Sequence, residues 1–327
     1  MEEIKEDMQK IIIDTDPGID DAIAILLALS AKEELEVLAL TTVNGNVGLE
    51  KVTKNAFKIL EIAGRNDIPV YKGSAEPLVR VHEHCEEFHG DDGLGNLQMA
   101  DSQRVPEAED AVDYLIRKVR EDKGNITLVP IGPLTNIAKA IQKDPEFIHN
   151  VKEVVIMGGA ENGGNMTPHA EFNFWMDPEA AKIVFQAGFE KVTMIGLDAT
   201  QYVWLNSDLR ELLWQINTPV SRFIHQITRV YVDGHWDYAK VIGCELCDVL
   251  IIAYLLNREI VKTKEAFVDI ETEGLCPGAS VVYPTFIYKD KKMNCLVAAE
   301  ADKKLFFETF FHYLFPGYED IVKQYNV

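Results

Sequence analysis

Cysteine, basic residues and long apolar stretches are all scarce in this sequence of 327 residues, and each scarcity excludes a class of protein. The cysteines are too few, and odd in number, for a fold held together by disulfides; they are Cys85, Cys244, Cys247, Cys276 and Cys295. Lysine and arginine number 32 against 53 acidic residues, a net charge of −21, and such a surface repels nucleic acid polymers and anionic membranes. The longest apolar run, at 22–31, is too short to span a bilayer.

Signals that direct a protein to another compartment are also missing. The first residues, MEEIKEDMQK, are mixed in charge, whereas a secretory signal begins with basic residues and continues with a longer apolar stretch. Together with the small number of cysteines, this predicts a cytoplasmic protein without a membrane partner.

Short apolar segments alternate with longer amphipathic ones along most of the chain, and no stretch resembles a linker or an internal repeat. Strands are expected at 10–16, 36–46, 68–73, 125–133, 151–160 and 191–198, and helices at 20–32, 48–64, 109–121, 134–145 and 177–187. This alternation predicts an α/β fold with an open, mostly parallel (mixed) β-sheet flanked by helices, in a single domain that spans 1–327.

Residues 74–108 interrupt this alternation, because they are rich in glycine, histidine and acidic residues and show weak periodicity. We interpret them as a long functional loop. Within the loop, His82, His84 and His89 lie close in sequence to several glutamates. A second metal site is one interpretation of this cluster, and a solvated loop with one functional histidine is the other.

Chemically useful groups lie at the carboxyl ends of several of the predicted strands. They are Asp14 and Asp16 at the end of the first strand, Asn44 and Asn46 at the end of the second, Ile131 near the end of another, and Gly158 with the following loop at the end of the next. In open α/β sheets, ligands bind beyond the carboxyl ends of the strands. We therefore expect these residues to meet at one edge of the sheet.

The segment IIIDTDPGIDD at 11–21 places four aspartates within eight positions, at 14, 16, 20 and 21. Helix capping explains one of them, for which we expect Asp20, but it does not explain four. Converging carboxylates stay ionised together only when a cation or strong donors compensate their charge. Oxygen ligands of this kind favour Ca²⁺ or Mg²⁺ over Zn²⁺, so the segment predicts a site for a hard metal ion.

Two classes of enzyme are compatible with this segment. One is phosphoryl transfer of the haloacid dehalogenase type, which also uses a strand followed by D-x-D, but that pattern expects Thr or Val where this chain has Gly18. The other is the cleavage of a glycosidic bond with the help of a metal ion that binds sugar hydroxyls.

Later segments favour the second class. They are TTVNGN at 41–46, EFHGDDGLGN at 87–96, LVPIGPLTNIAKA at 128–140, GNMTPHAEFNFWMDPEAA at 164–181 and CELCDVLIIAY at 244–254. In this order, and with D-T-D-P-G-x-D-D, the set resembles the inosine–uridine-preferring nucleoside hydrolase family from about residue 10 to about 300. The resemblance implies a Rossmann-like nucleoside hydrolase fold and Ca²⁺-dependent hydrolysis of the N-glycosidic bond of ribonucleosides.

The resemblance also implies roles for particular residues. Asp16 matches the catalytic base that deprotonates a Ca²⁺-bound water, which would attack the sugar directly and with inversion. Ca²⁺ would be bound by Asp14, Asp16, Asp21, Asp248 and the carbonyl of Ile131. The ribose would be bound by Asp20, Asn46, Asn165, Glu171 and Asn173, and His89 would lie near the base.

One residue departs from the family pattern. Many members carry a histidine, which protonates the leaving base, before the last metal-binding aspartate, and here that residue is Cys247. A thiol is a weaker acid at neutral pH, so Cys247 is either the acid or a small buried apolar residue. The alternative acids and base-binding residues are Tyr231, His235, Trp236 and His89. Cys244 and Cys247 form a lone C-x-x-C, which without a second pair does not indicate zinc.

We therefore expect a ribonucleoside hydrolase of purine or pyrimidine salvage, assembled as a homodimer or homotetramer, with mobile active-site regions around 74–96 and 222–240. A hydrolase of another ribosyl compound and a noncatalytic nucleoside-binding relative are the alternatives. The aromatic helix at 306–315 packs either on the domain or at a subunit interface, and the sequence does not distinguish these.

Overall fold

The computed structural model describes residues 8–81, 85–283 and 291–325. Its strands are β1 (Gln9–Thr15), β2 (Leu35–Thr42), β3 (Val70–Lys72), β4 (Ile126–Pro130), β5 (Glu153–Met157), β6 (Val192–Ile195), β7 (Trp204–Leu205), β8 (Cys244–Glu245), β9 (Val261–Ile270), β10 (Ser280–Tyr283) and β11 (Cys295–Ala301). Its α-helices are α1 (Ile19–Ser30), α2 (Leu49–Ile62), α3 (Glu86–His89), α4 (Ala111–Glu121), α5 (Thr135–Lys143), α6 (Phe172–Met176), α7 (Pro178–Gln186), α8 (Leu197–Thr200), α9 (Ser207–Ile216), α10 (Pro219–Ala239), α11 (Cys247–Leu256), α12 (Lys303–Leu314) and α13 (Glu319–Val322).

In the described residues one large sheet has nine strands in the order β10-β9-β11-β6-β5-β4-β1-β2-β3. The seven strands from β3 to β11 in this order pair in parallel with their neighbours. At the far edge, β9 pairs antiparallel with both β11 and β10. The predicted open, mostly parallel, mixed sheet is confirmed. The strand order reverses between β1 and β4, and this switch point is where α/β sheets of the Rossmann type bind their ligands.

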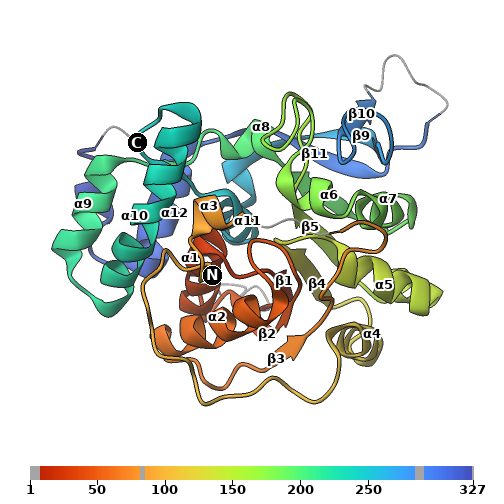
Figure 1. Ribbon diagram of the computed structural model, residues 1–327, viewed down its shortest axis with the longest axis horizontal. Coiled ribbons are helices and arrows are strands. Elements are labelled where there is room, and N and C mark those ends of the chain that lie inside the picture. The colour runs from red at the N-terminus through yellow and green to blue at the C-terminus, as the bar shows by residue number, and fades with distance from the viewer. Residues whose placement is uncertain (1–7, 82–84, 284–290, 326–327) are drawn as a thin grey trace, which may run out of the picture.

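The sheet separates two hydrophobic cores, because successive side chains of a strand point to opposite faces. Ile11 and Ile13 of β1 pack with α1, α2 and α8 to α12 on one face, and Ile12 packs with α4, α5 and α7 on the other. In Figure 1 these two groups of helices lie on opposite sides of the strands. The run IIID therefore forms a strand that is buried on both faces and ends in a carboxylate.

The aromatic helix near the C-terminus belongs to the first core. Phe306, Phe307, Phe310 and Phe311 of α12 are fully buried among the residues of α1 and α11. Of the two positions that the sequence allows for this helix, the structure therefore places it on the domain. Within the described residues, no helix combines the length and the apolar character needed to cross a bilayer.

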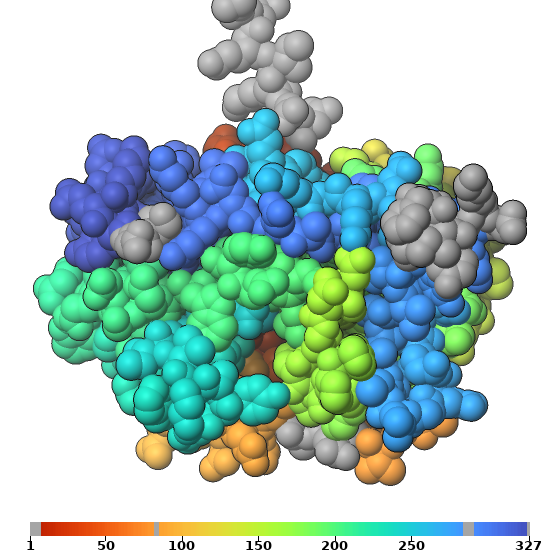
Figure 2. All heavy atoms as spheres, turned by 90° about the horizontal axis from the view of Figure 1, so that it is seen from above, coloured from red at the N-terminus to blue at the C-terminus, as the bar shows by residue number. Residues whose placement is uncertain are grey.

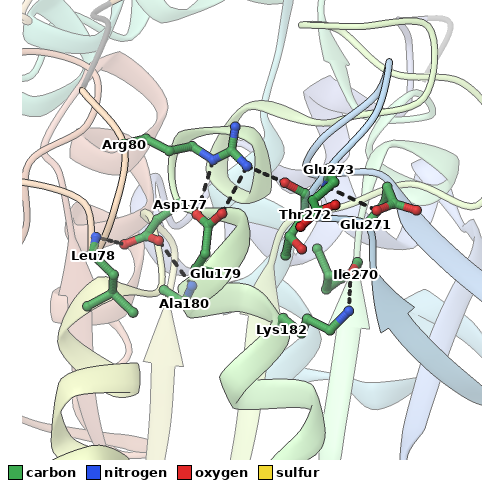
Figure 3. Close-up of polar contacts among 10 residues, drawn as sticks. All are labelled: Leu78, Arg80, Asp177, Glu179, Ala180, Lys182, Ile270, Glu271, Thr272 and Glu273. Carbon is green, nitrogen blue, oxygen red and sulfur yellow. Dashed lines mark hydrogen bonds and ion pairs between the residues drawn. The ribbon is translucent and has the colours of Figure 1, made fainter.

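The segment at 74–81 is attached firmly to the rest of the fold (Figure 3). The backbone N–H of Leu78 donates to Asp177 at 2.9 Å, and Arg80 forms a bidentate ion pair with Glu179 at 2.9 and 3.1 Å. Arg80 also donates to the carbonyl of Thr272. These contacts join the start of the long loop to α7 and to the connection between β9 and β10.

The expected cluster of histidines in this loop is only partly described. His82 and His84 lie outside the described residues, together with the glutamate at 83. His89 ends α3 and is 6% exposed, so it is a buried residue and not part of a solvated loop.

A candidate active site at the carboxyl edge of the sheet

A cavity of about 220 Å³ lies at the carboxyl edge of the sheet, among the loops that follow β1, β2, β4 and β5. Figure 2 shows a hollow between α10, in teal, and the yellow-green segment after β5, with red atoms of the N-terminal part at its floor. The residues predicted from the sequence that line the cavity are Asp20, Asn46, His89, Ile131, Asn165, Glu171, Asn173, Tyr231, His235, Cys247 and Asp248. Asp14, Asp16 and Asp21 are buried next to this lining, and Trp236 lies outside it.

Two aspartates at the end of β1 are enclosed and only half paired. Asp14 Oδ1 accepts hydrogen bonds from Thr41 Oγ1 at 2.5 Å and Asn136 Nδ2 at 2.8 Å, and Asp16 Oδ2 accepts one from the backbone N–H of Asn46 at 2.7 Å. The second oxygen of each carboxylate has no hydrogen-bond partner in the described structure. Burial raises the pKa of Asp14 to about 7 and that of Asp16 well above its usual range. A buried carboxylate oxygen without a partner is unfavourable, so each of these two oxygens is suited to bind a cation or a hydrogen-bond donor.

Glycines allow two loops to close around Asp16. A Cβ atom at Gly45, after β2, or at Gly132, after β4, would collide with the Asp16 carboxylate. Any side chain at these two positions would therefore displace Asp16. The motifs NGN and IGP thus shape the site through their glycines, a function that sequence patterns alone did not assign.

The first turn of α1 gives its two aspartates different roles. Asp21 Oδ2 accepts a hydrogen bond from the N–H of Gly18 at 2.9 Å, so the side chain at the third helical position closes the helix start. Asp21 also accepts from Thr15 Oγ1 at 2.5 Å and from Asn46 Nδ2 at 3.0 Å. The expectation that Asp20 caps this helix is wrong, because Asp20 lines the cavity instead.

Asp248 completes a cluster of carboxylates from distant parts of the chain. It lies in the first turn of α11, which packs against α1, and single oxygens of Asp20, Asp21 and Asp248 lie within 4.8 Å of one another. Both helix starts carry partial positive charge that favours carboxylates. Burial, followed by neighbouring carboxylates, raises the pKa of Asp20 to about 8 and that of Asp248 well above its usual range.

These carboxylates fit a hard divalent cation. The donor set consists of oxygen atoms, two buried carboxylate oxygens are unpaired, and the three clustered carboxylates repel one another without a counter-charge. Oxygen-rich sites of this kind are typical of Ca²⁺ or Mg²⁺. The arrangement could therefore hold a metal ion at the floor of the cavity.

Glu171 is fixed by backbone N–H groups on both of its oxygens. Oε1 accepts from Asn173 at 2.9 Å, and Oε2 accepts from Gly159 at 2.9 Å and from Phe174 at 3.4 Å. Glu171 thus caps α6 and joins it to the loop after β5. Burial raises the pKa of Glu171 to about 7.

Asn173 lies in the first turn of α6 and reaches the ends of two strands. Its Nδ2 donates to the carbonyl of Ile131 at 3.1 Å and to that of Met157 at 3.2 Å. The Ile131 carbonyl keeps a second lone pair for another partner. Asn165 is exposed and also lines the cavity, and its backbone carbonyl accepts a hydrogen bond from the Tyr238 hydroxyl at 3.4 Å.

The outer part of the cavity is aromatic. The ring centroid of Tyr231 lies 5.2 Å from that of His89 and 4.5 Å from that of His235. His89 Nδ1 accepts from the N–H of Ile19 at 3.0 Å, and burial lowers the pKa of His89 to about 3. His235 Nδ1 lies 2.8 Å from the carbonyl of Tyr231, so Nδ1 carries the proton. Burial also lowers the pKa of His235, and both histidines are therefore neutral.

Trp236 is the one predicted site residue that the structure places elsewhere. It is 46% exposed and does not line the cavity, whereas its neighbour His235 is 9% exposed and does. The two residues are consecutive on α10, and consecutive side chains of an α-helix point about 100° apart. The sequence segment alone does not show which of them faces inward.

Cys247 lies at the start of α11, lines the cavity and is 8% exposed. Burial raises the pKa of this thiol well above its usual range, and the nearby carboxylates of Glu245 and Asp20 raise it further. Cys244 is fully buried three residues earlier, and both thiols are free. Cys244 and Glu245 form the short strand β8, and α11 begins at Cys247.

Sequence reasoning missed several residues of the lining, which are Phe88, Met157, Trp204, Tyr238 and Glu245. Trp204 and Glu245 face each other across the two-residue strands β7 and β8. Such short strands leave no periodicity in the sequence, and the two positions are far apart along the chain. No sequence signal would have brought them to the site.

Comparisons with known proteins agree with this geometry. The family model described as inosine-uridine preferring nucleoside hydrolase matches residues 11–308. The inosine-uridine preferring nucleoside hydrolase of Leishmania major is 40% identical over 304 residues, which are 90% of this chain and 93% of the relative. The pyrimidine-specific ribonucleoside hydrolase RihA of Shewanella woodyi is 37% identical over 302 residues, which are 91% and 95% of the two chains.

A solved structure supports the same assignment. The purine-preferring ribonucleoside hydrolase from Gardnerella vaginalis superposes with a TM-score of 0.88 at 33% identity, over 96% of this chain and 100% of the other. The expected resemblance and fold are confirmed. The chain therefore belongs to the inosine-uridine preferring nucleoside hydrolase family and is an N-glycosidase that acts on ribonucleosides.

Proposed function

We propose that this enzyme hydrolyses ribonucleosides to free base and ribose with Asp16 as the base that deprotonates the attacking water. The observation that carries the proposal is the state of the Asp16 carboxylate. Oδ2 is held by the N–H of Asn46, and Oδ1 is buried without a partner beside the cavity. Such an oxygen is positioned by the backbone and free to accept a proton.

Ca²⁺ is the cofactor of this proposal. Its ligands would be the carboxylates of Asp14, Asp16, Asp21 and Asp248 and the carbonyl of Ile131, and the oxygen donor set supports this choice. When bound, the ion supplies positive charge that orients sugar hydroxyls and lowers the pKa of a water molecule. Asp20 belongs to the same cluster as Asp21 and Asp248 and lines the cavity, and we assign it to a ribose hydroxyl, as the family resemblance implies.

The remaining polar residues of the lining would bind the ribose. Asn46, Asn165, Glu171 and Asn173 surround the same cavity, and the backbone contacts of Glu171 fix its position. As the bond to the base breaks, positive charge develops on the sugar. Carboxylate and amide oxygens that are already in place stabilise this charge without reorganisation.

The aromatic end of the cavity would bind the base. Tyr231, His235, Trp204 and Phe88 offer flat surfaces against which a purine or a pyrimidine can pack. We place the enzyme in the salvage of nucleosides in the cytoplasm. The small, odd number of cysteines supports a reducing compartment. A homodimer or homotetramer belongs to the same proposal, and light scattering of the purified protein tests it.

The variant Asp16→Asn tests the central assignment. We expect kcat on inosine and uridine to fall by at least ~100-fold, because proton transfer to a positioned base contributes about that much or more. Ribose binding, measured by product inhibition or calorimetry, should persist. The control Asp208→Asn changes an exposed residue of α9 and should hydrolyse both substrates normally. Full turnover by Asp16→Asn would remove Asp16 from this role, and full turnover by the wild type after chelation of Ca²⁺ would remove the metal.

A further inference from the structure

Glu245 is a carboxylate of the cavity wall for which the proposed mechanism has no role. It ends β8 and is the cross-strand partner of Trp204 in β7, and both residues line the cavity. Its Oε1 accepts a hydrogen bond from Thr200 Oγ1 at 2.6 Å, and Oε2 has no hydrogen-bond partner in the described residues. Thr200, at the end of α8, is fully buried and also contacts the thiol of Cys247.

A base that leaves with the bonding electrons needs a proton, and the cavity offers few donors. None of its described lining residues is a lysine or arginine. His89 and His235 are neutral, and each holds one ring nitrogen in a hydrogen bond to backbone. A neutral imidazole does not supply a proton at neutral pH.

Three further lining residues are unsuitable for other reasons. Glu171 accepts three backbone N–H groups with its two oxygens, so it acts as an acceptor. Burial raises the pKa of Tyr231 well above its usual range, and nearby Asp20 raises it further, which makes this phenol a poor acid. Burial likewise raises the pKa of the Cys247 thiol well above its usual range. Glu245 offers a carboxyl group with one oxygen held by Thr200 and the other without a hydrogen-bond partner in the described residues.

We propose that Glu245 is the general acid that protonates the leaving base and that Thr200 positions it. This inference rests on the proposed function. In the step, the C1′–N bond breaks and its electron pair goes to the base nitrogen, which takes the proton from Glu245. Water adds to C1′, and its proton goes to Asp16. Glu245 then regains a proton from solvent and Asp16 releases one, so protons and charge balance over the cycle.

The surroundings of Glu245 favour its protonated form. Burial raises the pKa of Glu245, and the Thr200 hydroxyl opposes this only in part. The titratable groups that interact with it electrostatically are Asp20 of α1, Glu171 before α6, Tyr231 of α10 and Cys247 of α11. All of them are acidic, so none favours the ionised carboxylate. A glutamic acid with a raised pKa is suited to general acid catalysis near neutral pH.

Two substrates with different leaving groups test the proposal. Inosine needs a proton on its base, whereas p-nitrophenyl β-D-ribofuranoside releases a stable anion without one. For Glu245→Gln, we expect kcat/KM on inosine to fall by about 10²–10⁴-fold, the usual contribution of a general acid. On the p-nitrophenyl riboside, the loss should stay below about tenfold, because this leaving group needs no acid. The control Glu61→Gln makes the same change at an exposed position of α2 and should alter neither value.

The same measurements separate this inference from the proposed function. If wild-type enzyme with Ca²⁺ hydrolyses neither substrate, the proposed function fails. If Glu245→Gln lowers kcat/KM equally on both substrates, or lowers it on neither, the proposal for Glu245 is overturned. It is also overturned if Cys247→Ala, and not Glu245→Gln, shows selective loss on inosine.

A pH profile and a second variant complete the test. The wild-type kcat on inosine should decline as pH rises through the pKa of Glu245, because the acid form is the active one, and Glu245→Gln should lack this decline. Thr200→Val removes the hydroxyl at nearly constant volume and should show the same selectivity between substrates with a smaller loss. If Glu245→Gln fails to fold, as judged by circular dichroism, the comparison of the two substrates is made with Thr200→Val instead.

Discussion

Asp14 should make the stability of the metal-free enzyme depend strongly on pH. Its pKa is raised by burial from 3.8 to about 7, and it is 1% exposed, so solvent screens this effect little. Between these pH values the folded state binds more protons than the unfolded state, so the free energy of unfolding falls as pH rises. The contribution of Asp14 to the free energy of unfolding amounts to about 4 kcal/mol. It is fully present below about pH 4 and is lost above about pH 7. Asp20 and Glu171, whose pKa values are about 8 and about 7, act in the same direction.

Ca²⁺ should reverse this loss, because it binds the ionised carboxylates and competes with their protons. At a concentration of 100 times Kd it adds about 2.7 kcal/mol to the free energy of unfolding, a rise of about 5 °C in Tm. Thermal melts from pH 5 to pH 8, in EGTA and in CaCl₂, would measure both effects. The increase in Tm caused by Ca²⁺ should grow with pH.

The variant Asp14→Asn provides the control. It keeps an oxygen that can accept from Thr41 and Asn136 but does not titrate. Its melts in EGTA should therefore vary less with pH than those of the wild type. An increase in Tm that is absent, or equal at every pH, would refute the coupling between buried carboxylates and the metal ion.

Three further predictions concern single side chains. His235→Ala removes a ring that contacts Trp204 and Tyr231 and should lower kcat/KM on inosine by about 3–10-fold. Trp236→Ala should leave kcat/KM unchanged, because Trp236 lies outside the cavity. A larger loss for Trp236→Ala than for His235→Ala would contradict the orientation of α10. Cys247→Ala should leave the ratio of kcat/KM for inosine and uridine unchanged if the thiol only packs, and a shifted ratio would show contact with the base. Phe310→Ala should reduce the free energy of unfolding by about 3–5 kcal/mol in urea titrations, because it empties a fully buried position, and a loss below ~1 kcal/mol would contradict its place in the core.

Much of the sheet could be predicted from local sequence patterns. The run KIIID predicted a strand at 10–16, and β1 spans Gln9–Thr15; the amphipathic run after it predicted a helix at 20–32, and α1 spans Ile19–Ser30. Boundaries differ by up to four residues, because strand ends depend on hydrogen bonds from neighbouring strands. The short strand β8 was missed for the same reason, since it exists only through its pairing with β7.

The roles of individual side chains were harder to predict. Both Asp20 and Asp21 are at the start of α1, yet only the backbone geometry of Gly18 decides that Asp21 closes the helix start and Asp20 faces the cavity. Whether His235 or Trp236 points inward depends on the rotation of α10 against the rest of the fold. Pattern analysis gives the period of a helix but not this rotation.

The sequence by itself determined the alternation of strands and helices up to about residue 198, the acidic cluster after the first strand and the family, because apolar periodicity and short motifs are local properties of the chain. Only the tertiary structure decided that Asp248 meets Asp20 and Asp21, and that Thr200, Trp204 and Glu245 gather at one wall of the cavity. These residues are far apart in the chain and come together through the packing of α11 on α1 and the pairing of β7 with β8. Contacts between distant segments depend on the packing of the whole molecule, and no local pattern encodes them.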